Sequence, residues 1–179
     1  MHTYKFRVLI DTAEESDVFR DIEVSGMDNF ESFYSAILES FEFGGDQLAS
    51  FYMSNENWDK GHEITLMDMG MGNALESPSI MRETVIDEVI KKTGQKLILV
   101  YDFMRMWCFL IEVIEINDHV IDTPEIVFSV GNAPLEESKE VDLGNEGFVD
   151  DGMDLGNDID DIFSEFDDEG YDDEDYDDY

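Results

Sequence analysis

Basic residues are scarce in this chain of 179 residues. It holds 10 Lys and Arg against 46 Asp and Glu, which gives a formal net charge of −36 at pH 7. Binding of nucleic acid through its phosphates requires a basic face, and so does binding to an anionic membrane surface. The charge balance therefore argues against both kinds of ligand and favours a basic protein as the partner.

Cysteine is also scarce, and long apolar runs are missing. The single cysteine, Cys108, excludes an internal disulfide framework and a cysteine-rich zinc site. Its apolar neighbours predict a small buried side chain rather than a nucleophile. No apolar run reaches the roughly 18 residues that span a membrane. Residues 2–10 alternate in polarity, unlike a signal peptide. The sequence therefore predicts a cytoplasmic protein without membrane contact.

Histidine is scarce as well, and His2, His62 and His119 all lie in or beside predicted loops. No Gly-x-Ser-x-Gly or similar nucleophile turn accompanies them, so a hydrolase triad has no support. Three methionines alternate over residues 67–71 near His62, and clustered thioethers suit Cu(I), but methionines more often fill gaps in cores. The sequence favours a non-enzymatic role and predicts no catalytic, metal or cofactor site.

Residues 96–116 contain the strongest structural signal. Apolar side chains alternate on both faces of two extended runs, 97–103 and 107–116, which a polar break separates. This pattern, with its β-branched and aromatic content, favours two strands inside a sheet over a single buried helix. At the break, Asp102 is predicted to form a turn and to pair with Arg105, and a buried functional carboxylate is the alternative.

An amphipathic helix is expected to pack on this sheet. Aromatic and aliphatic residues recur at helical spacing over residues 29–41, which places them on one broad face. Asp28 and Glu31 resemble a capping pair at the start of the helix. Gly44 and Gly45 are expected to end it, because glycine readily takes the left-handed conformation at a helix end.

The other extended runs complete the predicted sheet. The further strands are residues 4–10, 19–24 and 47–53; residues 62–67 are a candidate for a short strand, and residues 126–128, after Pro124, are an edge strand at best. The first two are expected to form an antiparallel hairpin. A short helix is predicted between Thr84, which with Asp87 resembles a capping box, and Gly94. Residues 1–135 are thus predicted to form an α+β domain with a mixed, mainly antiparallel sheet of five to six strands and two helices.

The composition changes near Pro134. Residues 136–179, the acidic tail, carry 21 acids and one base, Lys139. Such a charge density cannot build a core, so the tail is predicted to be disordered. One apolar stripe at helical spacing is the predicted partner-binding element: Ile159, Ile162, Phe163 and Phe166. The expected function is a non-catalytic protein-interaction module whose tail binds a basic partner. A tail that is autoinhibitory, or that only solubilises the chain, is the alternative.

Several segments also carry a family resemblance. They are Tyr4-Lys5-Phe6-Arg7-Val8, Arg20-Asp21-Ile22-Glu23-Val24, Phe41-Glu42-Phe43, Gln47-Leu48-Ala49-Ser50-Phe51 and the run from Leu97 to Trp107. Together they resemble the plasmid pRiA4b ORF-3-like family over residues 4–116. The resemblance implies a mixed α+β fold and transfers no activity. Members are often named as insertion-sequence passengers or resolvases, which keeps a mobile-element accessory protein or an enzyme open as alternatives.

The chain departs from the family where polar residues are usual. The family commonly writes its last motif as Tyr-Asp-Phe-Gly-Asp, one residue, Trp, one residue, His. Here Met104 and Arg105 replace Gly-Asp, and Phe109, Tyr34 and Gln47 stand where the family has histidines. None of these replacements binds a metal well or transfers a proton near neutral pH. The family-motif positions are Arg20, Tyr34, Gln47, Tyr101, Asp102, Phe103 and Trp107.

Overall fold

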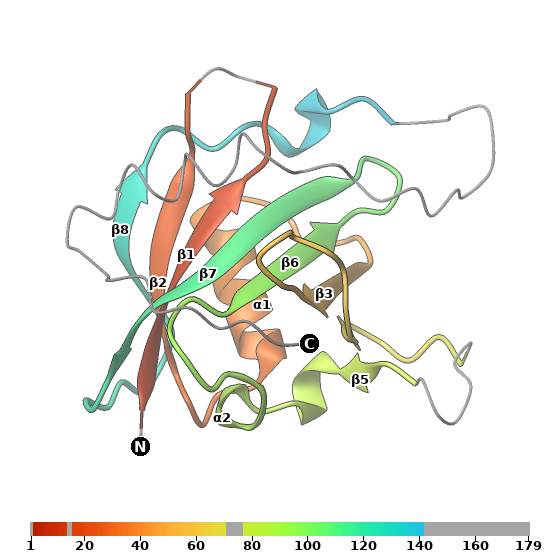
Figure 1. Ribbon diagram of the computed structural model, residues 1–179. Coiled ribbons are helices and arrows are strands. Elements are labelled where there is room, and N and C mark those ends of the chain that lie inside the picture. Colours follow the sequence, from red (N-terminus) through yellow and green to blue (C-terminus); the bar gives the residue numbers. More distant parts are fainter. Residues whose placement is uncertain (1, 14–15, 71–76, 142–179) are drawn as a thin grey trace.

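The computed structural model describes residues 2–13, 16–70 and 77–141 (Figure 1). The strands are β1 (Thr3–Ile10), β2 (Phe19–Ser25), β3 (Ala49–Met53), β4 (Glu63–Thr65), β5 (Ser79–Ile80), β6 (Lys96–Tyr101), β7 (Trp107–Asn117) and β8 (Glu125–Val130). The helices are α1 (Phe30–Ser40) and α2 (Ile86–Val89), with 3₁₀ turns η1 (Met81–Glu83) and η2 (Glu136–Ser138). The strands form one sheet in the order β5-β4-β3-β6-β7-β1-β2-β8.

The sheet is larger than the sequence predicts. It has eight strands rather than five to six. The neighbouring strands pair antiparallel, including the predicted hairpin of β1 and β2, except that β4 and β5 are parallel. β5 spans two residues, too few for an alternating pattern to reveal it, and the predicted strand count is therefore wrong. The α+β class, with a mixed sheet and two helices, is confirmed.

The two predicted central strands are confirmed. β6 and β7 pair antiparallel inside the sheet, with Tyr101 opposite Trp107. Both of these side chains belong to the core that contains α1, whereas Val100 and Cys108 belong to the core on the other face. Burial on both faces is the reason that the two runs are apolar on both sides. Cys108 is buried, as predicted, and this burial raises the pKa of its thiol.

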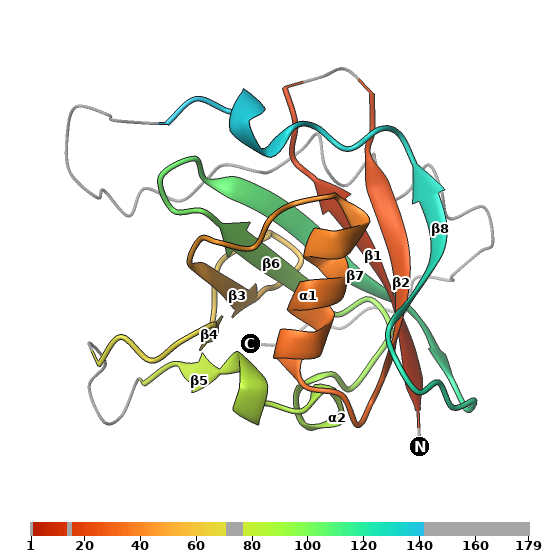
Figure 2. The same cartoon turned by 180° about the vertical axis from the view of Figure 1, so that it is seen from behind.

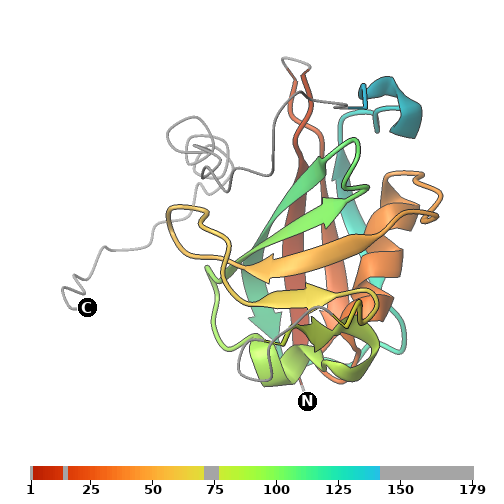
Figure 3. The ribbon, with the colours of Figure 1, turned by 90° about the vertical axis from the view of Figure 1, so that its right-hand side faces the viewer.

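The larger core lies between the sheet and α1. Figure 2 shows α1 lying across one face of the sheet, and Figure 3 shows α1 beside the strands after a 90° turn from Figure 1. The helix contacts β2 and β8 near one end of the sheet and η1, which directly follows β5 at the other end, so the sheet curls around it. The rings of Phe33 and Phe51 stack with 5.6 Å between centroids, and the ring of Phe6 lies 4.4 Å from that of Phe33.

The predicted helix over residues 29–41 is confirmed, but different residues set its ends. Asn29 rather than Asp28 is the N-cap, and its Oδ1 accepts a hydrogen bond of 2.9 Å from the amide of Ser32. At the other end Glu42 takes the left-handed conformation, with φ +59°. The two glycines predicted to end the helix lie further along the chain. Glycine takes this conformation without steric cost, but here a glutamate takes it beside the buried Phe43, whose amide donates to the carbonyl of Leu38 at 2.9 Å.

The second helix is also bounded differently from the prediction. Its N-cap is Val85, and the hydroxyl of Thr84 donates instead to the carbonyl of Ile80 at 2.8 Å. Asp87 accepts a hydrogen bond of 2.5 Å from the hydroxyl of Tyr4 on β1. The side chain of Asp87, which the local pattern predicts to cap the helix, therefore binds Tyr4 of the sheet instead. Among the described residues, no helix has the length and apolar character needed to cross a bilayer.

A smaller core covers the other face of the sheet. Trp58, in the loop between β3 and β4, is only 3% exposed and packs there with Ile98 and Val100. The Nζ atom of Lys96 lies 5.0 Å from the centroid of the Trp58 ring and 3.0 Å from the carboxylate of Glu56. The loop after β3 therefore shields a face of the sheet that would otherwise be exposed to water.

β8 forms an edge of the sheet, as predicted. The chain turns back directly after it at Gly131, where φ is +73°. A Cβ atom at this position would lie 2.7 Å from the carbonyl oxygen of Asp17, so both the conformation and the space require glycine. This turn directs the chain toward the end of the sheet at which β6 connects to β7 (Figure 1).

Candidate functional site

Residues 134–139, here called the strap, cross the end of the sheet beside the connection of β6 to β7 (Figure 1). The Nζ atom of Lys139 donates to the carbonyl of Met106 at 2.6 Å and lies 5.3 Å from the centroid of the Trp107 ring. The predicted boundary between domain and tail, after residue 135, falls inside the strap. The first residues of the acidic tail are therefore bound to the domain.

Glu136 makes the main contacts of the strap. Its Oε1 accepts a hydrogen bond of 2.6 Å from the hydroxyl of Tyr101, and its Oε2 accepts one of 2.7 Å from the amide of Gly44. Its carbonyl oxygen accepts a third, of 3.0 Å, from Nε1 of Trp107. The three donors come from β6, from the connection between α1 and β3, and from β7. Together they bind one carboxylate and its neighbouring carbonyl.

An aromatic cluster supports these donors. The ring of Phe43 lies 5.8 Å from that of Tyr101 and 5.2 Å from that of Trp107. The hydroxyl of Tyr101 also accepts a hydrogen bond of 3.0 Å from the amide of Gly45 and another from the backbone of Gln47. Both neighbours therefore orient this hydroxyl so that its proton points to the strap.

Tyr34 on α1 completes the cluster. Its ring lies 6.5 Å from that of Tyr101, and the residue is only 6% exposed. Its hydroxyl has no hydrogen-bond partner among the described residues. Burial, together with the nearby Tyr101 and Glu136, raises the pKa of this hydroxyl, which therefore stays protonated and able to donate.

Replacement of Glu136 by glutamine is expected to lower the pKa of Tyr101. Burial, followed by the hydrogen bond and the charge of Glu136, raises this pKa to about 12. Since the folded value exceeds the unfolded value of about 10, Tyr101 stabilises the fold fully below pH 10 and loses this effect as pH rises toward 12. A titration of tyrosinate absorbance should therefore show earlier ionisation in Glu136→Gln. Glu137→Gln, at an exposed neighbour, is the control, and equal curves for both variants would contradict the assignment.

The remaining family-motif positions have structural roles elsewhere. Oδ1 of Asp102 accepts hydrogen bonds from the amides of Met104 at 3.0 Å and Arg105 at 3.2 Å, and its other oxygen lies 3.6 Å from the Arg105 guanidinium. The predicted turn-forming role of Asp102 is therefore confirmed. Phe103 lies exposed in the same turn. Arg20 is buried and donates to three backbone carbonyls near the end of α1.

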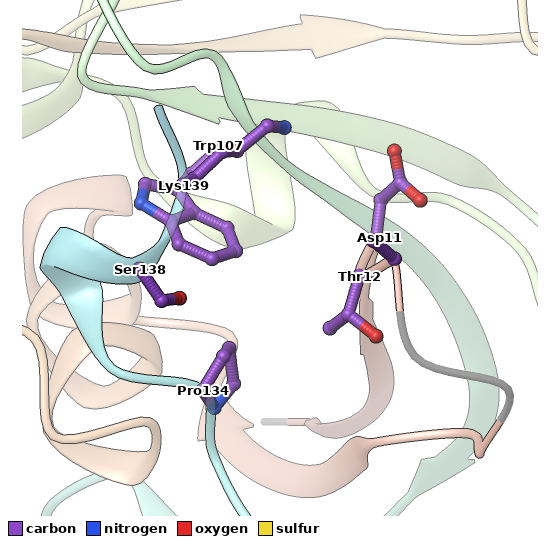
Figure 4. Close-up of a pocket in the computed structure, with 7 residues that line it drawn as sticks. Asp11, Thr12, Trp107, Pro134, Ser138 and Lys139 are labelled. Atoms are coloured by element: carbon purple, nitrogen blue, oxygen red, sulfur yellow. The ribbon is translucent and has the colours of Figure 1, made fainter. Parts of the chain in front are cut away.

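A hollow of about 480 Å³ opens beside the strap. Its lining residues are Asp11, Thr12, Ala13, Trp107, Pro134, Ser138 and Lys139. Figure 4 shows Asp11 and Thr12, from the end of β1, across the hollow from Trp107 and the strap. The lining offers hydroxyls, one carboxylate and one ammonium group against an aromatic wall. Such a lining suits a ligand with both polar and aromatic groups. The amine of Lys139 already donates to the carbonyl of Met106.

The three histidines lie exposed at the surface. His2 and His119 each pair with a carboxylate, at 2.9 and 3.1 Å. Nε2 of His62 lies 2.7 Å from the hydroxyl of Ser79, a pair that the parallel pairing of β4 and β5 creates. Among the described residues no carboxylate lies within ion-pair distance of His62 to orient it as a base. Within the same residues, no group of three His, Cys, Asp or Glu could hold a metal ion.

Two predicted sites lie wholly or partly outside the described residues. Met67 and Met69 of the methionine run are exposed, whereas Met71 is not described. The apolar stripe of the tail also lies outside the described residues: Ile159, Ile162, Phe163 and Phe166. Its partner-binding role stays a prediction. Glu136, by contrast, is a site residue that sequence reasoning missed, because its partners lie 29, 35 and 92 residues away in the chain.

Comparisons with known proteins agree with this architecture. The fold is similar to the crystal structure of a protein of unknown function, MM3350, from Methanosarcina mazei Go1. The two share 16% sequence identity and a TM-score of 0.62, over 77% of this chain and 75% of that one. This likeness shows the fold alone. No curated protein matches the sequence. Residues 2–178 match the family described as plasmid pRiA4b ORF-3-like protein. The chain therefore belongs to the plasmid pRiA4b ORF-3-like family.

Proposed function

We propose that this chain is a non-catalytic, cytoplasmic protein-interaction module whose acidic tail binds a basic protein. Residues 142–179 carry 18 Asp and Glu and no Lys or Arg, so these 38 residues hold half of the formal charge of −36. A field of this strength attracts a basic surface and accelerates its association. The same field repels phosphate backbones, which favours a protein over a nucleic acid as the partner.

The basic side chains of the domain offer the tail little to bind. Nine of the ten Lys and Arg already contact a carboxylate, a carbonyl oxygen or an aromatic ring of the described domain: Lys5, Arg7, Arg20, Lys60, Arg82, Lys91, Lys96, Arg105 and Lys139. Each of these contacts would have to be shared with the tail or broken. This favours an external basic partner over electrostatic docking of the tail on its own domain.

The anchored start of the tail carries the proposal. Glu136 accepts three hydrogen bonds from the domain, and Lys139 donates one to the carbonyl of Met106. The strap thus fixes the position of residues 134–139, from which the rest of the acidic tail continues in the chain. The spacing of Ile159, Ile162 and Phe166 provides an apolar face that could add affinity and specificity to charge attraction once a partner docks.

Removal of residues 142–179 tests this function. The shortened chain ends at Val141 and keeps the strap, so its folded domain should be unchanged. We expect its affinity for a lysine-rich model peptide to fall by about tenfold or more, because half of the negative charge is gone. Isothermal titration at low and at high salt measures this, and the affinity of the full chain should fall as salt screens the charges.

A second variant separates charge from apolar docking. Ile162→Ser with Phe163→Ser keeps every charge of the full chain and removes half of the stripe. It should bind the peptide more weakly than the full chain and more tightly than the chain ending at Val141. Equal affinity of the full and shortened chains would contradict the proposal. Hydrogen-exchange protection of residues 159–166 in the isolated protein would instead show that the tail folds back on its domain.

A further inference from the structure

We propose that the donors around Glu136 form a carboxylate-binding site, which an acidic peptide can occupy in place of the strap. This donor site consists of the hydroxyl of Tyr101, the amide of Gly44, Nε1 of Trp107 and the hydroxyl of Tyr34. Glu136 is its resident ligand in the structure. The inference concerns an acidic ligand of the domain and is independent of the basic partner of the tail.

The chemistry of the donor site selects an acceptor-only ligand. Three of its groups donate to Glu136, two of them to the carboxylate oxygens and one to the main-chain carbonyl. Tyr101 and Trp107 are buried and face each other in the register of β6 and β7, so their positions are set by the sheet. Preorganised, desolvated donors favour a charged carboxylate over a neutral amide of the same shape. A Glu within a peptide segment offers both required acceptors.

The strap does not use every donor of the site. The hydroxyl of Tyr34 lies beside Tyr101, is more than nine-tenths buried and has no hydrogen-bond partner among the described residues. A buried polar group without a partner is rare in native proteins and costs stability. A peptide with one further acceptor at this place would satisfy it. A peptide that also accepts a hydrogen bond from Tyr34 would therefore bind the donor site more tightly than the strap does.

The strap is also suited to be displaced. Its largest apolar side chain, Leu135, is 75% exposed, so it is held mainly by hydrogen bonds and not by apolar burial. Glu137 and Ser138 are exposed as well. The hollow lined by Trp107 and the strap borders the donor site and leaves room for an incoming peptide. A segment held in this way can exchange without unfolding of the sheet.

The test uses a fluorescent peptide copy of residues 132–141 as the probe. In full-length Glu136→Ala the resident carboxylate is absent, and this chain should bind the peptide about tenfold or more tightly than the unmodified chain, in which the strap competes. A peptide with Gln in place of its first Glu should bind about tenfold more weakly. Because the chain is strongly negative, the affinity should rise with salt, opposite to that for a basic partner.

Two further variants make the result specific. Tyr101→Phe in the Glu136→Ala chain keeps the ring and removes one of the two donors to the carboxylate, so the preference for the Glu peptide over the Gln peptide should decrease, while the amide of Gly44 retains part of it. Glu137→Ala should bind the peptide as weakly as the unmodified chain. The proposal is wrong if Glu136→Ala and the unmodified chain bind the peptide equally, or if the two peptides bind equally. The chain ending at Val141 retains the donor site, so failure here and failure of tail binding are distinguishable.

Discussion

Replacement of Phe51 by alanine is expected to lower the free energy of unfolding by about 3–5 kcal/mol. Phe51 is fully buried on β3, where its ring stacks on Phe33 at 5.6 Å and meets Phe30 edge-on at 5.2 Å. Its removal leaves a cavity between the sheet and α1, and the rigid rings around it cannot collapse to fill that space. Urea denaturation followed by circular dichroism measures the loss.

A matched variant distinguishes cavity formation from a general effect of losing a phenylalanine. Phe128 on β8 is 52% exposed. Phe128→Ala should therefore cost less than about 1 kcal/mol, because exposed positions lose little apolar burial. Similar losses for the two variants would show that the core does not depend on the packing of α1 against β3.

Replacement of Arg20 by alanine is expected to cost about 3 kcal/mol, because buried acceptors bonded to a charged group lose their donor. Its Nε donates to the carbonyl of Ser40 at 3.1 Å, and its Nη1 donates to those of Phe19 and Val130 at 2.8 Å each. The guanidinium carbon also lies 4.8 Å from the centroid of the Phe41 ring. One side chain thus joins β2, the end of α1 and the edge strand β8.

The geometry of the guanidinium gives this prediction a graded control. Arg20→Lys keeps the charge but lacks the planar fork that reaches several carbonyls, so it should lose a substantial part of the same stability. Arg82→Ala removes an exposed arginine whose side chain forms an ion pair with its exposed neighbour Glu83, and should cost less than about 0.5 kcal/mol. Hydrogen exchange should show earlier opening of β8 in the Arg20 variants. A loss for Arg20→Ala no larger than that for Arg82→Ala would contradict the role.

Local patterns predicted the parts of the fold that depend on one segment at a time. The double-faced apolar runs of residues 96–116 identify two inner strands because only strands buried on both faces need such side chains. The apolar stripe of residues 29–41 identifies α1, because apolar residues at this spacing fall on one face of a helix that packs on a core. The turn at Asp102 follows from the tendency of aspartate to bond backbone amides nearby. In each case the residues that form the pattern also form the predicted element or lie within a few residues of it.

The errors share a different physical origin. β5 is too short to carry a period, and its pairing with β4 depends on a partner about 15 residues earlier in the chain. The expected caps at Asp28 and Thr84 fail because neighbouring residues or the sheet provide better partners. Trp58 lies in a loop, and its burial depends on packing against the second face of the sheet, which is built from segments elsewhere in the chain. Propensity is a weak prior that tertiary contacts override.

The sequence by itself determined the class of fold, the order of its main elements and the strong negative charge, since these depend on composition and on short-range periodicity. Only the tertiary structure decided that the tail begins as a bound strap and that Tyr34, Gly44, Tyr101 and Trp107 gather around Glu136. These groups are up to about a hundred residues apart in the chain. Their meeting requires α1, the segment after it and the strap to pack against β6 and β7, and no local pattern encodes contacts between segments so distant in the chain.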